Sequence, residues 1–308
     1  MTTAERTAAG DAPDVATWLG SQLARRFDDW VAAEVRTEVV TLAGALADDA
    51  AVLREHHDRL VDGGVPAPAA ATYLVEWWAG IVAGAVGEAL ATTGAGLVVD
   101  GIEAPTDIRF HVHPDGWPCR VELPGRAVVT AGHPWAGTRG TSVLDDRRAV
   151  VERAVAGLVA VAAPIVDACH GLARVGRTGL WNEVGDALGT AVAHQQRFTV
   201  TPEMVEVLEA AVRAPGAPWR TRPDLVLVEA PAGTAHVVRK GGCCLAYTEQ
   251  RPARDADDPS LDDSLRAYLR CFPDDPDGPR YCTTCSFRTL PDTTARQLFW
   301  HERRAAAD

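Results

Sequence analysis

The sequence has no excess of basic residues. Thirty lysine and arginine residues stand against 42 aspartate and glutamate residues, which gives a formal net charge of −12. Phosphate groups attract cations and repel anions, so this balance argues against a general binder of nucleic acid or of anionic membranes. The hydrophobic share of 47% and the charged share of 23% are those of an ordinary globular protein.

Cysteines and long apolar runs are also scarce. Seven cysteines in 308 residues are too few for a disulfide-stapled scaffold. The N-terminal residues have no basic start followed by an apolar core, so we expect no secretory signal peptide. The most apolar stretches without charge, residues 77–87 and 154–166, fall short of the roughly 20 residues of a membrane-spanning helix. We therefore expect a soluble cytoplasmic protein with no transmembrane segment, whose thiols are normally reduced.

The familiar signatures of catalysis are missing as well. The chain has no G-x-S-x-G elbow, no P-loop and no H-E-x-x-H pair, and no intrinsic flavin or nicotinamide site is evident. It also shows no internal repeat of about 20 to 50 residues. Any chemistry must therefore come from less common arrangements of side chains.

Apolar residues at three- and four-residue spacing predict two helices in the first hundred residues. The second of these helices is predicted over 69–92, after the first helix whose apolar face is given below. In it, Trp77 and Trp78 are interpreted as core packing. Its small residues, among them Gly80 and Gly87, would let another helix approach closely. The apolar face of the first helix consists of Leu23, Phe27, Trp30, Val31, Val35 and Val39.

The rest of the chain predicts hairpins that alternate with helices. Alternating residues around the turn Pro114-Asp115-Gly116 predict a β-hairpin near 106–125. Helix should resume near Val143, and Pro164 should kink or break it. The strongly apolar stretch 148–172 belongs to this helix. Further elements are expected as a helix over 180–197, a helix over 201–212 capped by Thr201, and strands at 225–228 and 236–239 that form a second hairpin.

This order of elements predicts an α+β fold, mostly helical with segregated β-hairpins. We expect a mainly helical domain over 1–213 and a C-terminal β unit over 214–308.

Five of the seven cysteines lie near the C-terminal end. Cys282 and Cys285 form a C-x-x-C at a turn, where both thiolates can point at one ion. Cys243 and Cys244 follow Gly241-Gly242, and these glycines allow the bend that joint ligation by neighbouring residues requires. The fifth is Cys271, whereas Cys119 and Cys169 are interpreted as buried structural residues.

Several chemistries compete for these thiols. A structural zinc site normally uses two short-spaced ligand pairs, and directly adjacent ligands are uncommon there. A thioredoxin-like dithiol needs its C-x-x-C at a helix start in a βαβ unit, which this pattern lacks. An iron–sulfur cluster fits the count and the reducing compartment, although the spacing is that of neither ferredoxin pattern. The residues alone indicate a metal ion or a cluster, and slightly favour the cluster.

At these residues the sequence resembles the FhuF-like ferric-siderophore reductases, bacterial [2Fe-2S] proteins with a Cys-Cys pair followed by Cys-x-x-Cys. The matching residues are Arg239-Lys240-Gly241-Gly242-Cys243-Cys244 and Tyr281-Cys282-Thr283-Thr284-Cys285. Three softer similarities lie upstream, at 179–185, at Trp219-Arg220-Thr221 and at His113-Pro114-Asp115-Gly116.

The resemblance implies a C-terminal iron–sulfur unit with Cys243, Cys244, Cys282 and Cys285 as ligands of a [2Fe-2S] cluster. It implies one-electron reduction of Fe(III) in a siderophore, with hydroxamates as the expected class, and release of Fe(II). No catalytic residue beyond the cluster is needed, and electrons should come from an external ferredoxin or flavoprotein. The alternatives are an iron–sulfur electron carrier in a biosynthetic pathway and a zinc-stabilised interaction module.

The chain departs from the family in the segment between its cysteine motifs. Here 37 residues, 245–281, separate the motifs, which is much longer than in the family and indicates an insertion. Ser260 is a candidate cap for a short helix within it, and Cys271 is a possible substitute ligand. In the long tail after Cys285, the apolar residues 298–300 either dock the tail or bind a partner.

The residues that would hold the chelate are less sharply indicated. The candidate pocket walls are Trp77, Trp117 and Trp181, and His56 and His57 are interpreted as exposed. Positive charge near a cluster raises its reduction potential, which makes Arg239, Lys240 and Arg288 candidates for tuning it. The simpler interpretation of each is a solvated surface charge. The candidate substrate-binding residues are Trp181, Arg177, His113, Arg239 and Lys240.

Overall fold

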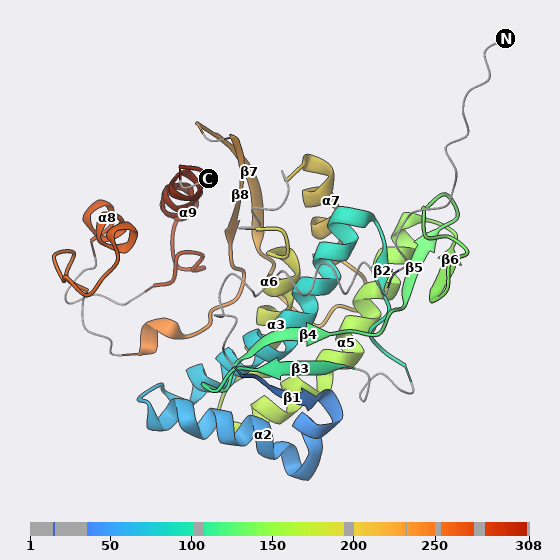
Figure 1. Cartoon of the computed structure of the whole chain (residues 1–308), viewed down its shortest axis with the longest axis horizontal. Coiled ribbons are helices and arrows are strands. Elements are labelled where there is room, and N and C mark those ends of the chain that lie inside the picture. The colour runs from blue at the N-terminus through green and yellow to red at the C-terminus, as the bar shows by residue number, and fades with distance from the viewer. Residues whose placement is uncertain are drawn as a thin grey trace.

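The computed structural model describes residues 15, 36–101, 108–193, 200–231, 233–249, 254–273 and 281–306. Within these ranges the chain forms seven α-helices and three small sheets, which confirms the α+β class (Figure 1). The positions 23–35 of the first helix expected from the sequence lie outside the described residues.

One helix forms the centre of the molecule. Helix α3 (Ala67–Thr93) is buried along most of its length and packs against α2 (Leu42–Asp62), α5 (Arg147–Leu172), α6 (Arg177–Gly189) and α7 (Pro202–Val212). The predicted close approach is confirmed. A Cβ atom added at Gly87 would lie 2.6 Å from the Cβ of Ala191, and one at Gly80 would lie 3.3 Å from that of Ala187. Trp78 is fully buried in the core, as expected.

Two three-stranded sheets flank these helices. The predicted hairpin is confirmed as β3 (Arg109–Val112) and β4 (Pro118–Glu122), and β1 (Glu38–Thr41) pairs with β3 as a third antiparallel strand. Val39 therefore lies on β1 and is 53% exposed, so its placement on a helix was wrong.

The second sheet consists of β2 (Gly96–Leu97), β5 (Ala127–Thr130) and β6 (Thr141–Leu144). Because 141–144 pairs in parallel with β5, the next helix starts at Arg147 and not near Val143. That helix, α5, continues past Pro164 without a break.

The later elements agree well with the sequence pattern. Helix α6 ends at Gly189, and the rest of its expected length is turn or lies outside the described residues. Thr201 caps α7, since its hydroxyl accepts a hydrogen bond from the amide of Met204. The second hairpin is confirmed as β7 (Asp224–Ala230) and β8 (Gly233–Arg239), which pair antiparallel.

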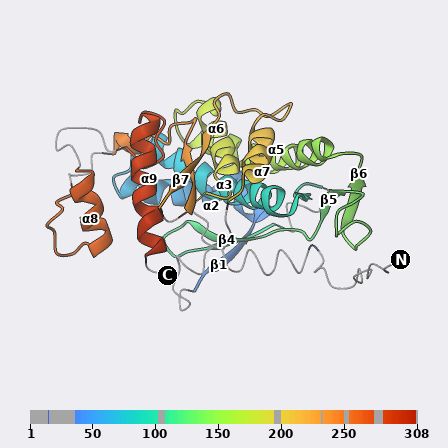
Figure 2. The same ribbon diagram turned by 90° about the horizontal axis from the view of Figure 1, so that it is seen from above.

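The C-terminal segment adds η1 (Ala246–Thr248), α8 (Asp263–Cys271) and α9 (Leu290–Ala305). Helix α9 lies along β8, where the Gln297 side chain bonds both the amide and the carbonyl of Val238. Helix α8 lies on the outer side of α9 (Figures 1 and 2), where Tyr268 stacks on Trp300 with ring centroids 5.2 Å apart. The tail thus docks on the insertion. The cap of α8 is Asp262 and not Ser260, because Asp262 accepts from the amide of Leu265.

Two of the described helices, α3 and α5, are long and apolar enough to cross a membrane by length and composition. Their most apolar stretches are 83% and 56% buried inside the protein, which is consistent with core helices of a soluble protein. Both helices are longer than the uncharged stretches 77–87 and 154–166 in the sequence, because single charges such as Glu88 and Arg153 interrupt the apolar runs without ending the helices.

Candidate functional site: two cysteine motifs around a buried lysine

The two cysteine motifs, 37 residues apart in sequence, meet in the structure. The backbone amide of Lys240, at the end of β8, donates to the carbonyl of Thr284 in the C-x-x-C turn at 2.7 Å. The guanidinium of Arg239 donates to the carbonyl of Arg288, just after that turn, at 3.2 Å. These bonds fasten the strand that leads into the Cys-Cys pair to the loop that carries the second pair.

Three of the four thiols interact directly. Hydrogen bonding with the Cys282 thiol, together with burial, raises the pKa of Cys244. Hydrogen bonding from Cys282 lowers the pKa of Cys285 to about 7. Burial raises the pKa of Cys243, whose side chain also lies within electrostatic range of Cys244. Cys244 and Cys285 are buried, whereas Cys243 and Cys282 are half-buried, so the group lies just beneath the surface.

The predicted bend before the Cys-Cys pair is present, and a buried carboxylate holds it. The two oxygens of Asp186 accept hydrogen bonds from the amides of Gly241 and Gly242, each at 2.8 Å. A Cβ atom at Gly241 would lie 2.5 Å from the backbone of Arg222, so only glycine fits at this position. After the pair, Leu245 turns the chain through a left-handed conformation with φ of 60°.

The bend and the segment 219–221 both pack on helix α6. The Asn182 carboxamide oxygen accepts from the amides of Arg220 and Thr221 at 2.9 and 3.2 Å. A Cβ atom at Gly185 would come within 2.7 Å of the Trp219 ring, which therefore lies directly on the helix. Two of the sequence stretches that carry the softer resemblance, 179–185 and 219–221, thus pack on each other beside the cysteines.

Lys240 is buried between two glutamates. Its ammonium lies 2.6 Å from the carboxylate of Glu76 on α3 and 3.0 Å from that of Glu183 on α6. Burial alone would lower the pKa of Lys240, but these two carboxylates outweigh it and raise it well above its ordinary value. Burial raises the pKa of Glu183 to about 8 and that of Asp186 to about 6, although Lys240 opposes both shifts.

The raised pKa of Glu183 predicts a pH-dependent stability. Between pH 4.5 and about 8 the folded chain holds a proton on Glu183 that the unfolded chain has lost. The free energy of unfolding should therefore fall as pH rises through this window, by at most about 1.4 kcal/mol per pH unit from this group. Urea titrations of the metal-free chain at several pH values should show a shallower fall for Glu183→Gln than for wild type. Parallel curves for the two proteins would contradict the assignment.

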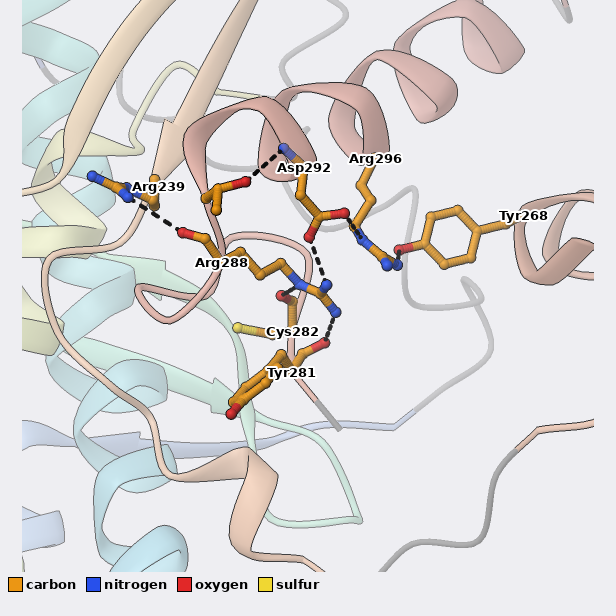
Figure 3. A network of polar contacts seen from close by, with 8 residues as sticks. Arg239, Tyr268, Tyr281, Cys282, Arg288, Asp292 and Arg296 are labelled. Carbon is orange, nitrogen blue, oxygen red and sulfur yellow. Dashed lines mark hydrogen bonds and ion pairs between the residues drawn. The ribbon is translucent and has the colours of Figure 1, made fainter. Parts of the chain in front are cut away.

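Arg288 holds the C-x-x-C turn, as Figure 3 shows. Its guanidinium donates to the carbonyls of Cys282 and Tyr281 at 2.9 and 2.8 Å and pairs with Asp292 at 2.7 Å. Asp292 also accepts from Arg296, which in turn donates to the hydroxyl of Tyr268 on α8 at 2.9 Å. The insertion is therefore connected to the cysteine turn through a continuous chain of polar contacts.

Replacing Arg288 by methionine should loosen this turn. The variant loses three charge-assisted bonds: those to the carbonyls of Tyr281 and Cys282, of which the Cys282 carbonyl keeps the amide of Cys285, and the pair with Asp292. We therefore expect a loss of about 1.5–3 kcal/mol in the free energy of unfolding. Arg270→Met is the matched control, because Arg270 pairs with Asp257 on the surface and is 62% exposed. Urea titration should separate the two variants. An equal, small effect in both would show that the Arg288 contacts do not hold the turn.

The candidate substrate residues lie in different places. Arg239 and Lys240 lie at the cysteine motifs, but Lys240 is buried and not a surface charge. Trp181 is half-buried on α6. Arg177 pairs with Asp167 on α5 at 2.8 Å. His113 stacks on Trp117 in the β3–β4 turn and lines a separate cavity of about 270 Å³ with Arg59 and His56. Trp77 stacks on Tyr73, one turn away on α3.

The remaining cysteines and histidines are also placed. Cys119 and Cys169 are buried as expected, and burial raises the pKa of Cys169 to about 12. Cys271 is exposed at the end of α8. His56 and His57 are buried, not exposed, because His56 packs on Trp78 and His57 bonds the carbonyl of Ala67.

Sequence reasoning missed the acidic residues of the site, Glu76, Glu183 and Asp186. A signal was available for two of them: Glu183 and Asp186 are one helical turn apart in an otherwise apolar stretch, which places two carboxylates on one face. The sequence around Glu76 gives no such signal, and its role follows only from its contact with Lys240.

In the comparisons with known proteins, no family model and no curated protein matches this chain. Among the described residues, no group of three or more His, Cys, Asp or Glu side chains is arranged to hold a single metal ion. The four cysteines instead form two adjoining pairs. A [2Fe-2S] cluster takes four thiolates, two for each iron, so the donor set fits this group.

Proposed function

We propose that this protein is a [2Fe-2S] ferric-siderophore reductase of the FhuF-like type. The observation that carries the proposal is the meeting of Cys243-Cys244 with the Cys282–Cys285 turn, held by the bond from the Lys240 amide to Thr284. The resemblance of both motifs to that family supports the same function. When bound, the cluster would accept and donate one electron at a time.

The chain's own part is to hold the four thiols and to leave an approach to them. Cys243 and Cys282 are half-buried, so a bulky chelate need not enter a deep pocket. An aromatic cluster adjoins the C-x-x-C turn, in which Phe287 lies against Tyr247 and Tyr281 with centroids 5.5 and 5.7 Å away. Phe287 is 59% exposed, which gives an apolar surface on which the organic part of a chelate can rest.

The substrate would be a ferric hydroxamate chelate. One electron, supplied by an external ferredoxin or flavoprotein, reduces Fe(III) to Fe(II), which hydroxamate oxygens bind poorly, so the metal is released. No proton transfer and no nucleophile are required. The acidic chain and the thiolates repel a strongly anionic chelate, which favours a neutral or cationic one. A reducing cytoplasm suits the free thiols.

The first test is the visible spectrum of anaerobically purified protein, with analysis of iron, sulfide and zinc. We expect broad absorption from about 320 to 600 nm that bleaches with dithionite, and about two irons and two sulfides per chain. One zinc and no colour would replace the proposal with a zinc-stabilised interaction module.

The second test separates a reductase from an electron carrier. Adding a ferric hydroxamate to the reduced protein should restore the colour, while a strong Fe(II) chelator records the released metal. If colour returns with protein electron acceptors but not with ferric chelates, the protein is an electron carrier and not a siderophore reductase.

A further inference from the structure

Lys240 is the only lysine in the chain, since the other 29 of its 30 basic residues are arginines. Arginine is a flat fork with five donors, whereas lysine ends in a compact ammonium group. The single lysine lies where a compact charge is needed, between two carboxylates from different helices in a space that leaves its side chain 12% exposed.

The charge of Lys240 acts on the cysteines. It lies within electrostatic range of Cys243, Cys244 and Cys282, which belong to both motifs. Its position is fixed at three points, by Glu76, by Glu183 and by its own backbone bond to Thr284. Glu76 is 35% exposed, so water screens its negative charge more than it screens the buried ammonium.

We propose that Lys240 is a positioning residue that sets the reduction potential of the four-thiolate site, with Glu76 and Glu183 fixing the place of its ammonium. This inference rests on the proposed function. Four thiolates leave a [2Fe-2S] cluster with a net negative charge, and reduction adds one more. A fixed positive charge nearby favours the reduced form and therefore raises the potential.

Arg239 is the natural comparison, because it is the adjacent cation on the same strand. Its guanidinium is one-third exposed and is neutralised by Asp224 at 2.5 Å. Both cations are paired with carboxylates, so the pairing does not separate them. The difference is exposure: the Arg239 side chain is 33% exposed and that of Lys240 is 12% exposed, so water weakens the field of Arg239 at the thiols more than that of Lys240. The structure therefore assigns the larger effect to Lys240, although both cations precede the cysteine pair.

The test is a redox titration of Lys240→Met in which the visible absorption is the readout, with Arg239→Met as the matched control. Because Lys240→Met leaves the buried Glu183 and the partly exposed Glu76 without their partner, the double variant Lys240→Met/Glu183→Gln also removes the ionisable group of Glu183 and keeps the shape. We expect the lysine variants to lower the equilibrium constant for reduction about tenfold, which is about 59 mV for one electron. The control should shift less, because water screens the more exposed Arg239 more strongly.

The outcomes are distinguishable. If the folded, iron-loaded lysine variants shift no more than Arg239→Met, the role of Lys240 is overturned while the cluster stands. If wild-type protein binds no iron and sulfide, the proposed function itself fails.

The burial of Lys240 can be checked without a cluster. A protease that cleaves only after lysine has one site in this chain and would release fragments 1–240 and 241–308. The folded metal-free chain should resist it over times that suffice to cleave the urea-unfolded chain. If the folded chain is cleaved as fast as the urea-unfolded chain, Lys240 is not buried and the proposal is overturned.

Discussion

Cys282→Ser is expected to abolish the visible absorption of the protein and its binding of iron and sulfide. Cys282 bonds with both Cys244 and Cys285, so it occupies the centre of the thiol group. Serine is a hard oxygen ligand that stays protonated at neutral pH and cannot replace a thiolate toward iron. Iron and sulfide analysis after anaerobic purification measures the effect directly.

Cys271→Ser is the matched control for this experiment. Cys271 is exposed at the end of α8, on the outer side of α9, so its replacement should leave the absorption and the iron content unchanged. If Cys271→Ser bleached the protein and Cys243→Ser did not, Cys271 would be the ligand in place of Cys243. A coloured Cys282→Ser protein with full iron content would remove the C-x-x-C turn from the site.

Gly241→Ala is expected to cause the largest loss of stability among single substitutions at the bend. The added Cβ would lie 2.5 Å from the backbone carbonyl group of Arg222, and backbone cannot yield as a side chain can. Overpacking of this kind costs about 1–3 kcal/mol, occasionally more. Moving Gly241 would also break its amide bond to Asp186, which positions the Cys-Cys pair.

Gly179→Ala provides the comparison. Gly179 lies in the first turn of α6, and a Cβ atom there meets nothing within 4 Å. Alanine should be neutral or stabilise the helix by up to about 1 kcal/mol. Urea titration of the metal-free chains gives both free energies, and iron content after reconstitution reports on the bend. Equal stability of the two variants would mean that residue 241 can move away from Arg222 at little cost.

Much of the secondary structure could be predicted, because it depends on neighbours in sequence. The apolar spacing of 69–92, the Thr201-Pro202 start of α7 and the turn at Pro114-Asp115-Gly116 all act within a few residues, and all three predictions are confirmed. The errors came where distant pairing overrode local preference. Val39 joined β3 across about 70 residues, and residues 141–144 joined β5.

The sequence by itself determined the chemistry on offer, which is two closely spaced thiol pairs in an acidic chain without other catalytic signatures. Only the tertiary structure decided that the pairs meet, that Asp186 holds the bend between Gly241 and Gly242, and that Lys240 is buried and not solvated. The physical reason is the range of the interactions. Periodicity and capping are local, whereas the contacts of Lys240 join residues 76, 183, 240 and 284, which only the packing of separate elements brings together.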